Sequence, residues 1–443
     1  MKIQLSEHFT YSKLIRFTVP SMIMMIFTSI YGVVDGIFVS NFVGKTAFAA
    51  INLIMPFLMI FGAIGFMIGT GGSALVAKTM GEGDHKRANR LFSMLIYLSI
   101  LFGVALTVLG IIFLEPIARL LGAEGQMLKD CVAYGRIILI ALTAFVLQNE
   151  FQSFLIAAER PTLGLAVTVA AGVTNIVLDA LFVGVLEWGL IGAAAATAIS
   201  QAVGGIIPLI YFMLPNKSLL RLTRFTFDKR ALLKTCTNGS SEMMTNLSLS
   251  LVNMLYNFRL MEYAGEDGIA AYGVILYVGF VFLSIFIGYS IGVAPIVGYH
   301  FGAGNYKELK NLFRKSLTLL SICSILMTIS AELLAEPLSK IFVGYDRGLL
   351  EMTTRGFMLY SLCFLVLGIN IFASSFFTAL NDGLVSAILS FLRTLLFQVG
   401  AVLLLPLILA LDGVWLAVVA AELTALAVSI FCFVKFKGKY HYA

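Results

Sequence analysis

The chain carries few charged residues for its length. Only 12% of its 443 residues are charged, 60% are apolar, and the mean hydropathy is +0.97. A water-soluble domain has about 25% charged residues. This composition therefore excludes an ordinary soluble globular protein, because so little charge cannot cover a water-facing surface.

Cysteine and histidine are scarce as well. The five cysteines have neither paired nor metal-ligand spacing, and the four histidines fall in predicted loops or tails without ligand-like partners. These absences argue against a disulfide framework and a metal centre. Residues 1–13 are polar and the first apolar run is too long for a cleavable signal peptide, so none is expected.

Motifs for catalysis and nucleotide binding are also missing. Gly81-Glu82-Gly83 lacks the Lys-Ser/Thr that would complete a phosphate-binding loop, and no nucleophile is paired with a base. The lysines and arginines lie in loops between apolar runs, where they set membrane orientation rather than bind nucleic acid. The sequence thus predicts neither an enzyme, nor an ATP-driven pump, nor a nucleic-acid-binding protein, and no cofactor.

What the chain does contain is a series of long apolar runs. A helix needs about 20 apolar residues to cross a bilayer, and helices satisfy their own backbone polar groups in lipid. We predict an all-α membrane protein with twelve spans, at about 14–40, 47–77, 91–114, 130–157, 162–186, 190–213, 236–260, 269–299, 316–335, 351–380, 384–410 and 414–434. Pro20 is the predicted bending point of the first span, because proline removes a helical hydrogen bond.

Basic residues are unevenly distributed between the two sides of these spans. With the N-terminus in the cytoplasm, 21 of the 30 lysines and arginines fall on the inner side, eight on the outer side, and Arg393 within a span. Basic loops are retained in the cytoplasm. The sequence therefore predicts that both termini are cytoplasmic.

The two halves of the chain look related. An offset of 221 residues pairs several local features, namely Gly81-Glu82-Gly83 with Gly302-Ala303-Gly304, Glu115-Pro116 with Glu336-Pro337, and Gly135 with Gly356. Each half has an even number of spans, so both enter from the same side as a parallel repeat. We predict an N-terminal lobe at 1–213, a cytoplasmic linker at 214–235 and a C-terminal lobe at 236–443.

Two acids within first-half spans stand out, because ionisable residues in a membrane are costly. Asp35 and Asp179 lie at a similar depth below the predicted outer helix ends, and so do Tyr134 and Thr197. Asn175 lies one turn deeper on the face of Asp179. The predicted topology can therefore gather two carboxylates, an amide, a hydroxyl and a phenol into one cluster.

Such a cluster can couple transport to a cation. Two carboxylates close together in a low dielectric do not both ionise easily, so one holds a proton or the pair holds a cation. Oxygen ligands from Asp35, Asn175, Asp179 and Thr197 suit Na⁺, by analogy with other hard cations. The alternative is a structural hydrogen-bond network, since membrane helices use such groups in packing.

Other polar residues within or beside the predicted spans have more than one candidate role. Gln148, Asn149, Glu150 and Gln152 form a polar patch that lines an aqueous cavity, where it would meet the substrate, or faces a neighbouring helix. Glu242 lies near the inner start of its span. Arg393 and Glu422 lie on successive spans within an arginine's reach, and we predict a structural ion pair there.

Four stretches give the chain a resemblance to the MATE (multidrug and toxic compound extrusion) family, in its bacterial or archaeal DinF-like and MepA-like branch. They are Pro20 with Val34-Asp35-Gly36-Ile37-Phe38-Val39, Gly81-Glu82-Gly83, Asn175-Ile176-Val177-Leu178-Asp179, and Gly189-Leu190-Ile191-Gly192-Ala193-Ala194-Ala195-Ala196-Thr197. The resemblance implies two six-helix lobes arranged in a V. It also implies an ion network at Asp35, Tyr134, Asn175, Asp179 and Thr197, with Pro20 as the hinge of the first helix. NorM-like relatives use an acid in the seventh span, but residues 248–253 contain none.

The function that this resemblance implies is an antiporter in a bacterial or archaeal cell membrane, working as a monomer. It would export organic cations in exchange for H⁺ or Na⁺ by alternating access. The alternative from the same superfamily is a lipid-linked oligosaccharide flippase, whose pyrophosphate cargo would need basic residues in the cavity. A channel is the third possibility, but nothing in the sequence resembles a selectivity filter.

Overall fold

The computed structural model describes residues 3–43, 45–216 and 218–443. The side chains at 33, 35–37, 39–42, 45, 46, 48, 49, 52 and 56 lie outside the described part. Every regular element in the described ranges is a helix. The elements are α1 (Tyr11–Phe42), α2 (Lys45–Gly81), α3 (His85–Leu120), α4 (Gly125–Ile140), α5 (Leu142–Ala157), α6 (Pro161–Asp179), η1 (Ala180–Val185), α7 (Gly189–Met213), α8 (Lys229–Gly302), α9 (Tyr306–Val343), α10 (Arg347–Ser361), α11 (Phe364–Ala379), α12 (Gly383–Phe391), η2 (Leu392–Leu396), α13 (Phe397–Leu404) and α14 (Pro406–Tyr440).

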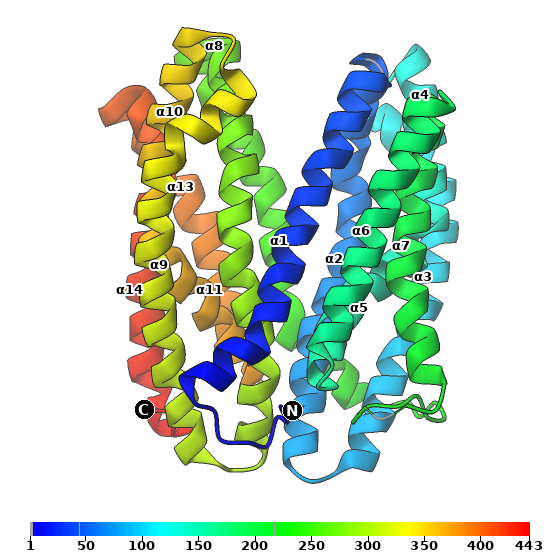
Figure 1. Cartoon of the computed structure of the whole chain (residues 1–443), viewed down its shortest axis with the longest axis vertical. Coiled ribbons are helices and arrows are strands. Elements are labelled where there is room, and N and C mark those ends of the chain that lie inside the picture. The colour runs from blue at the N-terminus through cyan, green and yellow to red at the C-terminus, as the bar shows by residue number, and fades with distance from the viewer. Residues whose placement is uncertain (1–2, 44, 217) are drawn as a thin grey trace.

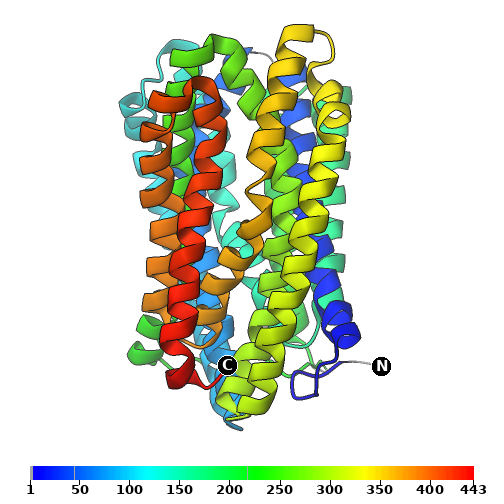
Figure 2. The ribbon, with the colours of Figure 1, turned by 90° about the vertical axis from the view of Figure 1, so that its left-hand side faces the viewer.

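The helices form two bundles arranged as a V, which confirms the predicted fold class. One bundle contains α1–α7 and the other α8–α14, and the two diverge toward the end opposite both termini (Figure 1). A view turned by 90° shows the helices running along the same long axis (Figure 2). We call the end at which both chain termini lie the terminal end, and the opposite one the far end.

The helices account for twelve membrane crossings. Within the described ranges, nine helices are long and apolar enough to span a bilayer, and two bent helix pairs raise this number to eleven. One of the nine is α8, whose 74 residues would extend about 110 Å if straight, far more than a bilayer needs. Gly265 interrupts it with a non-helical φ of 63°. Counting α8 as two crossings adds one to eleven and gives twelve.

The internal repeat is visible in the helix boundaries. The third span of each half begins at His85 and Tyr306, which are 221 positions apart. The fourth span of each half is a bent pair, α4–α5 with a bend of 55° and α10–α11 with a bend of 49°. Matching bends at matching positions show that the two halves share one architecture.

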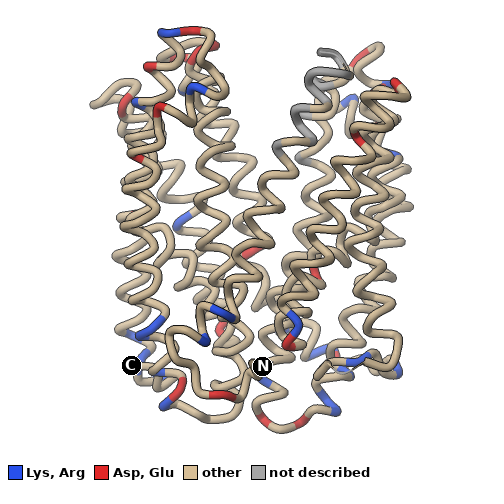
Figure 3. The backbone as a smooth tube through the Cα atoms, in the orientation of Figure 1, with Lys and Arg blue, Asp and Glu red and all other residues tan. Residues whose placement is uncertain are grey.

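The outer faces of the bundles are apolar, as lipid requires. On α3, Leu101, Val104, Val108 and Ile112 are 62%, 52%, 54% and 60% exposed. In a soluble protein such a surface would be an interaction patch, but on a spanning helix it faces hydrocarbon chains. Charged residues gather at the two ends of the bundles, with few between (Figure 3).

The connection between the two halves begins in extended and irregular backbone and continues into a helix. Residues 214–216 and 218–228 are not helical, and α8 begins at Lys229, inside the predicted 214–235 linker. Asp228 ends the connector by accepting a hydrogen bond from the backbone of Ala231 at 3.0 Å. This cap starts the helix seven residues before the predicted span, because polar residues at its beginning lie outside the apolar run.

The two bundles meet at the terminal end, where α2 packs against α8. A Cβ atom added at Gly239 would lie 1.8 Å from the Met67 carbonyl oxygen, and one at Gly71 would lie 2.1 Å from that of Thr235. Only glycine permits backbones to approach this closely. The amide of Asn381 also donates to the Ala74 carbonyl at 3.3 Å, joining α2 to the α11–α12 turn. The bundles are therefore sealed at the terminal end.

Candidate functional site

The buried polar face of α6 is the centre of the first-lobe site. Asp179 is 0% exposed and Asn175 is 2% exposed, and Thr168 lies further along the same face at 4%. The neighbouring helix α7 is fixed to this region by a 2.8 Å hydrogen bond from Ser200 Oγ to the Ala171 carbonyl. The face thus points into the bundle and away from lipid.

Helix α1 covers this face of α6. A Cβ atom at Gly172 would lie 2.5 Å from the ring of Phe27 and 2.8 Å from that of Tyr31, so glycine lets α1 pack closely here. Gly172 is seven residues before Asp179 and thus two turns from it on the same face. The backbone of Asp35 belongs to α1, but its side chain lies outside the described residues. The structure therefore places α1 against the site, and the predicted role of the Asp35 side chain stays a prediction.

Tyr134 and Thr197 come from α4 and α7, which pack against each other, and α7 in turn packs against α6. Tyr134 is 2% exposed and lies in the same apolar cluster as Ala193 and Ala194 of α7. Two atoms of the predicted set, Thr197 Oγ1 and Asn175 Nδ2, are buried without a hydrogen-bond partner among the described residues. Buried polar atoms without a protein partner are uncommon and often have a functional explanation.

The helix geometry changes directly after Asp179. Residues Ala180–Val185 form a π-helix, and Phe182 in this turn stacks on Trp188 with ring centroids 4.7 Å apart. Short π-helical segments within α-helices occur frequently at functional sites. Asp179 is thus the last residue before a local widening of its helix.

The polar patch on α5 lies inside the first lobe. Gln148, Asn149, Glu150 and Gln152 are 6%, 4%, 0% and 6% exposed, so they form no open binding surface in this state. Gln148 and Gln152 line, with Thr168, a small void of about 10 Å³, which is about the size of one water molecule. The backbone of Glu150 instead packs against Gly69 of α2. A role of these residues in binding substrate stays a prediction.

The second lobe holds the predicted ion pair. Arg393 Nη1 lies 3.6 Å from Glu422 Oε1, with the two side chains 11% and 3% exposed, which confirms the pairing. Asn370 donates to Glu422 Oε2 at 2.8 Å and accepts a bond from Ser429 at 2.9 Å. Arg393 lies in the second π-helix, η2. Both carboxylate oxygens of Glu422 thus have a partner within the second lobe, as a structural ion pair requires.

The second-lobe counterpart of Asp35 is aromatic. Tyr256 is 2% exposed and stacks on Tyr272 at 4.8 Å with an interplanar angle of 6°. Tyr272 donates to Asn253 at 3.0 Å. The position that carries an acid in the first half thus carries a packed tyrosine pair in the second.

Sequence reasoning missed a set of contacts at the terminal end. The Nδ1 of His8 lies 2.6 Å from Glu308 Oε2. The backbone N–H of Leu5 donates to Glu159 Oε1 at 2.7 Å. These partners are 300 and 154 positions away, so local pattern could not reveal them. The only feature of the sequence that pointed to these contacts was a glutamate close to the start of a helix.

Comparison with known proteins agrees with this architecture. The sequence model of the MatE family matches the chain twice, at residues 20–181 and 243–403, which together exceed half of it. The two matches begin 223 and end 222 positions apart (243 minus 20, and 403 minus 181), close to the repeat offset.

Curated relatives span almost the whole chain. The multidrug export protein MepA of Staphylococcus saprophyticus is 24% identical over 428 residues, covering 94% of this chain and 91% of the relative. MepA of Staphylococcus aureus (strain MRSA252) is 22% identical over 419 residues, covering 94% and 92%.

Solved structures show the same fold. A structure described as the outward-facing conformation of a multidrug resistance MATE family transporter superimposes with a TM-score of 0.93 at 22% identity, covering 98% of each chain. With the twelve crossings and the repeated half, these matches lead to one assignment: this chain is a multi-pass membrane protein that belongs to the MatE family.

Proposed function

We propose that this protein exports organic cations in exchange for H⁺ or Na⁺, by alternating access between its two lobes. The observation that carries this proposal is the buried first-lobe site around Asp179, which is 0% exposed at the end of α6. Buried acids in membrane helices commonly bind a coupling ion. The curated relatives are named multidrug export proteins, which supports the cargo class.

Orientation decides which state the structure represents. Basic residues concentrate at the terminal end, so that end is cytoplasmic by the positive-inside rule. The far ends, where the lobes diverge (Figure 1), are then outside. With this orientation the proposed state is outward-open, and the outward-facing description of the similar structure supports this reading.

The proposed cycle uses the first lobe as the coupling unit and the lobes at 1–213 and 236–443 as the moving bodies. H⁺ or Na⁺ enters from outside and binds Asp35 and Asp179, with Tyr134, Asn175 and Thr197 completing the site. Neutralising two carboxylates removes their repulsion and lets α1 pack differently on α6. Pro20 lies inside α1 and is its weakest point, since it removes a helical hydrogen bond.

The proposed cargo follows from charge. Arg393 is the deep basic residue that the sequence places within a span, and Glu422 already lies beside it. A base-poor interior suits a lipophilic cation, to which aromatic rings add cation–π contacts. The alternative, a flippase for lipid-linked oligosaccharides, needs unoccupied basic groups for pyrophosphate, so the Arg393–Glu422 pair disfavours it.

One chain supplies both lobes and the interface between them, so we propose that the protein works as a monomer in a bacterial or archaeal cell membrane. Beyond the coupling ion it needs no cofactor, and transport involves no chemical conversion of the cargo.

Dye efflux from cells tests the proposal. Asp35→Asn should abolish extrusion of a fluorescent cationic dye, because a neutral amide cannot cycle a proton or hold Na⁺ equally well. Asp130→Asn is the matched control, since Asp130 is a partly exposed acid in the first turns of α4 that accepts a hydrogen bond from Gln126 at 2.8 Å, and it should leave efflux intact. Efflux at the wild-type rate from Asp35→Asn cells would remove that residue from the mechanism.

A further inference from the structure

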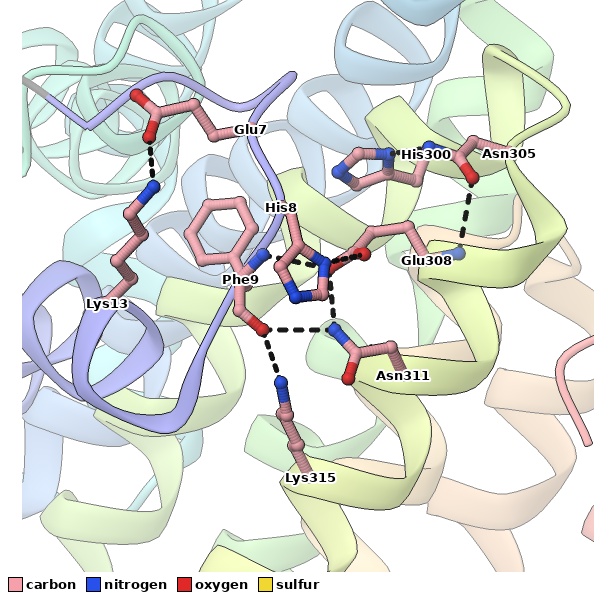
Figure 4. Close-up of polar contacts among 9 residues, drawn as sticks. All are labelled: Glu7, His8, Phe9, Lys13, His300, Asn305, Glu308, Asn311 and Lys315. Atoms are coloured by element: carbon pink, nitrogen blue, oxygen red, sulfur yellow. Dashed lines mark hydrogen bonds and ion pairs between the residues drawn. The ribbon is translucent and has the colours of Figure 1, made fainter.

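The N-terminal segment, residues 3–10, precedes a first-lobe helix yet binds the second lobe. The Phe9 N–H donates to Glu308 Oε1 at 2.9 Å, and His8 Nδ1 lies 2.6 Å from Glu308 Oε2. The Phe9 carbonyl accepts bonds from Asn311 Nδ2 at 3.0 Å and Lys315 Nζ at 2.6 Å. All three second-lobe partners lie on α9, as Figure 4 shows.

The same segment is also fixed to the first lobe. The Leu5 N–H donates to Glu159 Oε1 at 2.7 Å, in the turn between α5 and α6. Leu5 and Phe9 are both 0% exposed, and the Phe9 ring packs edge-on against His300 of α8 at 6.5 Å. A stretch of five residues thus joins the two lobes at the terminal end.

The Glu308 carboxylate is directed toward the segment and is not needed to start its own helix. Asn305 already caps α9, accepting the Glu308 N–H at 3.2 Å. The Glu308 oxygens bond instead to Phe9, His8 and Asn311. Only 7% of this side chain is exposed, although His8 itself is 67% exposed. The bond from the buried Phe9 N–H is therefore shielded from water and stronger for it.

The second half repeats the arrangement. The segment before α8 lies along α3 of the first lobe, where the Thr223 N–H donates to Ser93 Oγ at 2.7 Å and the Asp228 N–H contacts Met94 Sδ at 3.1 Å. Met94 and Lys315 are 221 positions apart, so equivalent positions of the third spans hold the two segments. The helix after each segment also begins with a side-chain cap. The Lys13 N–H donates to Thr10 Oγ1, and the Ala231 N–H donates to Asp228 Oδ1.

We propose that residues 3–10 act as a strap that stabilises the outward-open state by tying the lobes together on the cytoplasmic side, with Glu159 and Glu308 as its two anchors. This inference rests on the proposed function for its orientation and its two states. The linker before α8 must cross between lobes to connect them, but the N-terminal segment has no such obligation. When the cytoplasmic side opens, one anchor must release, and the two glutamates are therefore positioning residues of the transport cycle.

Distances between spin labels test the strap. Gln126→Cys and Arg347→Cys place labels on exposed, repeat-related positions at the far ends of α4 and α10 (126 plus 221 is 347) in a background without the native cysteines. Glu308→Ala should raise the ratio of inward-open to outward-open molecules about ten-fold, because it removes charge-assisted hydrogen bonds. Glu159→Ala should shift the ratio in the same direction.

The double variant distinguishes a strap from two separate contacts. A strap is released when either end is cut, so Glu159→Ala with Glu308→Ala should shift the ratio no further than the stronger single variant. Independent contacts would add, and an additive shift overturns the proposal, as does an unchanged ratio in both single variants. Glu82→Ala is the matched control, because Glu82 lies outside the strap at the same end of the molecule and pairs only locally with Lys78 at 3.6 Å, and it should leave the ratio unchanged.

Two provisions keep the result decisive. If Glu308→Ala does not fold, Lys315→Met replaces it. It removes the ammonium bond to the Phe9 carbonyl, together with a cation–π contact to Tyr11 at 5.3 Å, and a ratio equal to wild type then overturns the strap. The label distances require neither a drug nor an ion gradient. Shifted distances in a protein that fails to export cations would support the strap and refute the proposed function, and the reverse pair of results would do the opposite.

Discussion

Gly81 and Gly302 occupy equivalent positions of the two halves and make reciprocal contacts across the lobe interface. A Cβ atom at Gly81 would lie 2.0 Å from the Tyr299 carbonyl oxygen, and one at Gly302 would lie 2.0 Å from the Lys78 carbonyl oxygen. Tyr299 and Lys78 are themselves 221 positions apart. The seal at the terminal end is therefore built from one contact used twice, as expected for a parallel repeat related by an axis along the membrane normal.

This reciprocity makes Gly302→Ala a test of the seal. The added methyl group cannot fit, and overpacking typically costs about 1–3 kcal/mol, so the ratio of inward-open to outward-open molecules should rise about ten-fold or more. Label distances between the far ends of the lobes report that ratio. Gly273→Ala on the same helix has open space around it and should leave the ratio unchanged. An unchanged ratio in Gly302→Ala would mean that the seal does not hold this state.

The Arg393–Glu422 pair should matter for stability and not for coupling. Breaking a buried ion pair costs roughly 3–5 kcal/mol because one charge is left uncompensated, and the 3.6 Å separation places this pair near the lower end. Glu422→Gln should therefore lower the thermal midpoint in detergent. The double variant with Arg393→Gln should recover part of the loss, because no lone charge remains.

Transport by the same variants separates the two roles. If the pair is structural, Glu422→Gln protein that folds keeps the wild-type dependence on ΔpH and ΔNa⁺. A change in the coupling ion, or loss of coupling with normal stability, would show that the second lobe takes part in coupling.

Asp382 ties the C-terminal tail to the start of α12 and should make stability pH-dependent. Burial alone would raise the pKa of this carboxyl, but hydrogen bonds from Tyr440 and Lys439 outweigh it and hold the pKa below its ordinary value. A lowered pKa stabilises the fold above the unfolded pKa of about 3.9, and this contribution is lost as the pH falls through the folded pKa. Asp382→Asn should thus cost about 1–2 kcal/mol at neutral pH and progressively less below about pH 4.

The control for this prediction is another helix cap. Asp346 caps α10 by accepting the Leu349 N–H at 3.1 Å, and asparagine caps helices about as well as aspartate. Asp346→Asn should leave the thermal midpoint nearly unchanged at every pH. An effect of Asp382→Asn that does not change with pH would instead show that the charge of this carboxylate does not stabilise the tail.

The architecture was predictable from the sequence because the lipid bilayer restricts both the length and the composition of the helices that cross it. Spanning segments must be long and apolar, and the structure places helices at all twelve predicted runs. The Arg393–Glu422 pair was also predictable, since depth along two neighbouring spans can be counted in residues. The start of α8 was not, because the polar residues after Asp228 are helical without entering the apolar run.

The contacts between lobes could not be predicted. Gly302 and Lys78 meet through backbone atoms, and Glu308 bonds to the backbone of Phe9, so neither contact leaves a characteristic pair of residue types. Asp35 and Asp179 were found by their charge, which is rare within spans. Rare residue types can be recognised in a single sequence, whereas close backbone packing requires coordinates.

Transport in proteoliposomes with ΔpH and ΔNa⁺ imposed separately tests the central claim most directly. The wild-type protein should move a fluorescent organic cation against its gradient under at least one of these ion gradients, and Asp179→Asn should lose that concentrative transport. Glu115→Gln, which changes an exposed acid paired with Arg119, should retain it. Concentrative transport by Asp179→Asn at the wild-type rate would contradict coupling in the first lobe, and purely downhill movement by the wild type would contradict antiport.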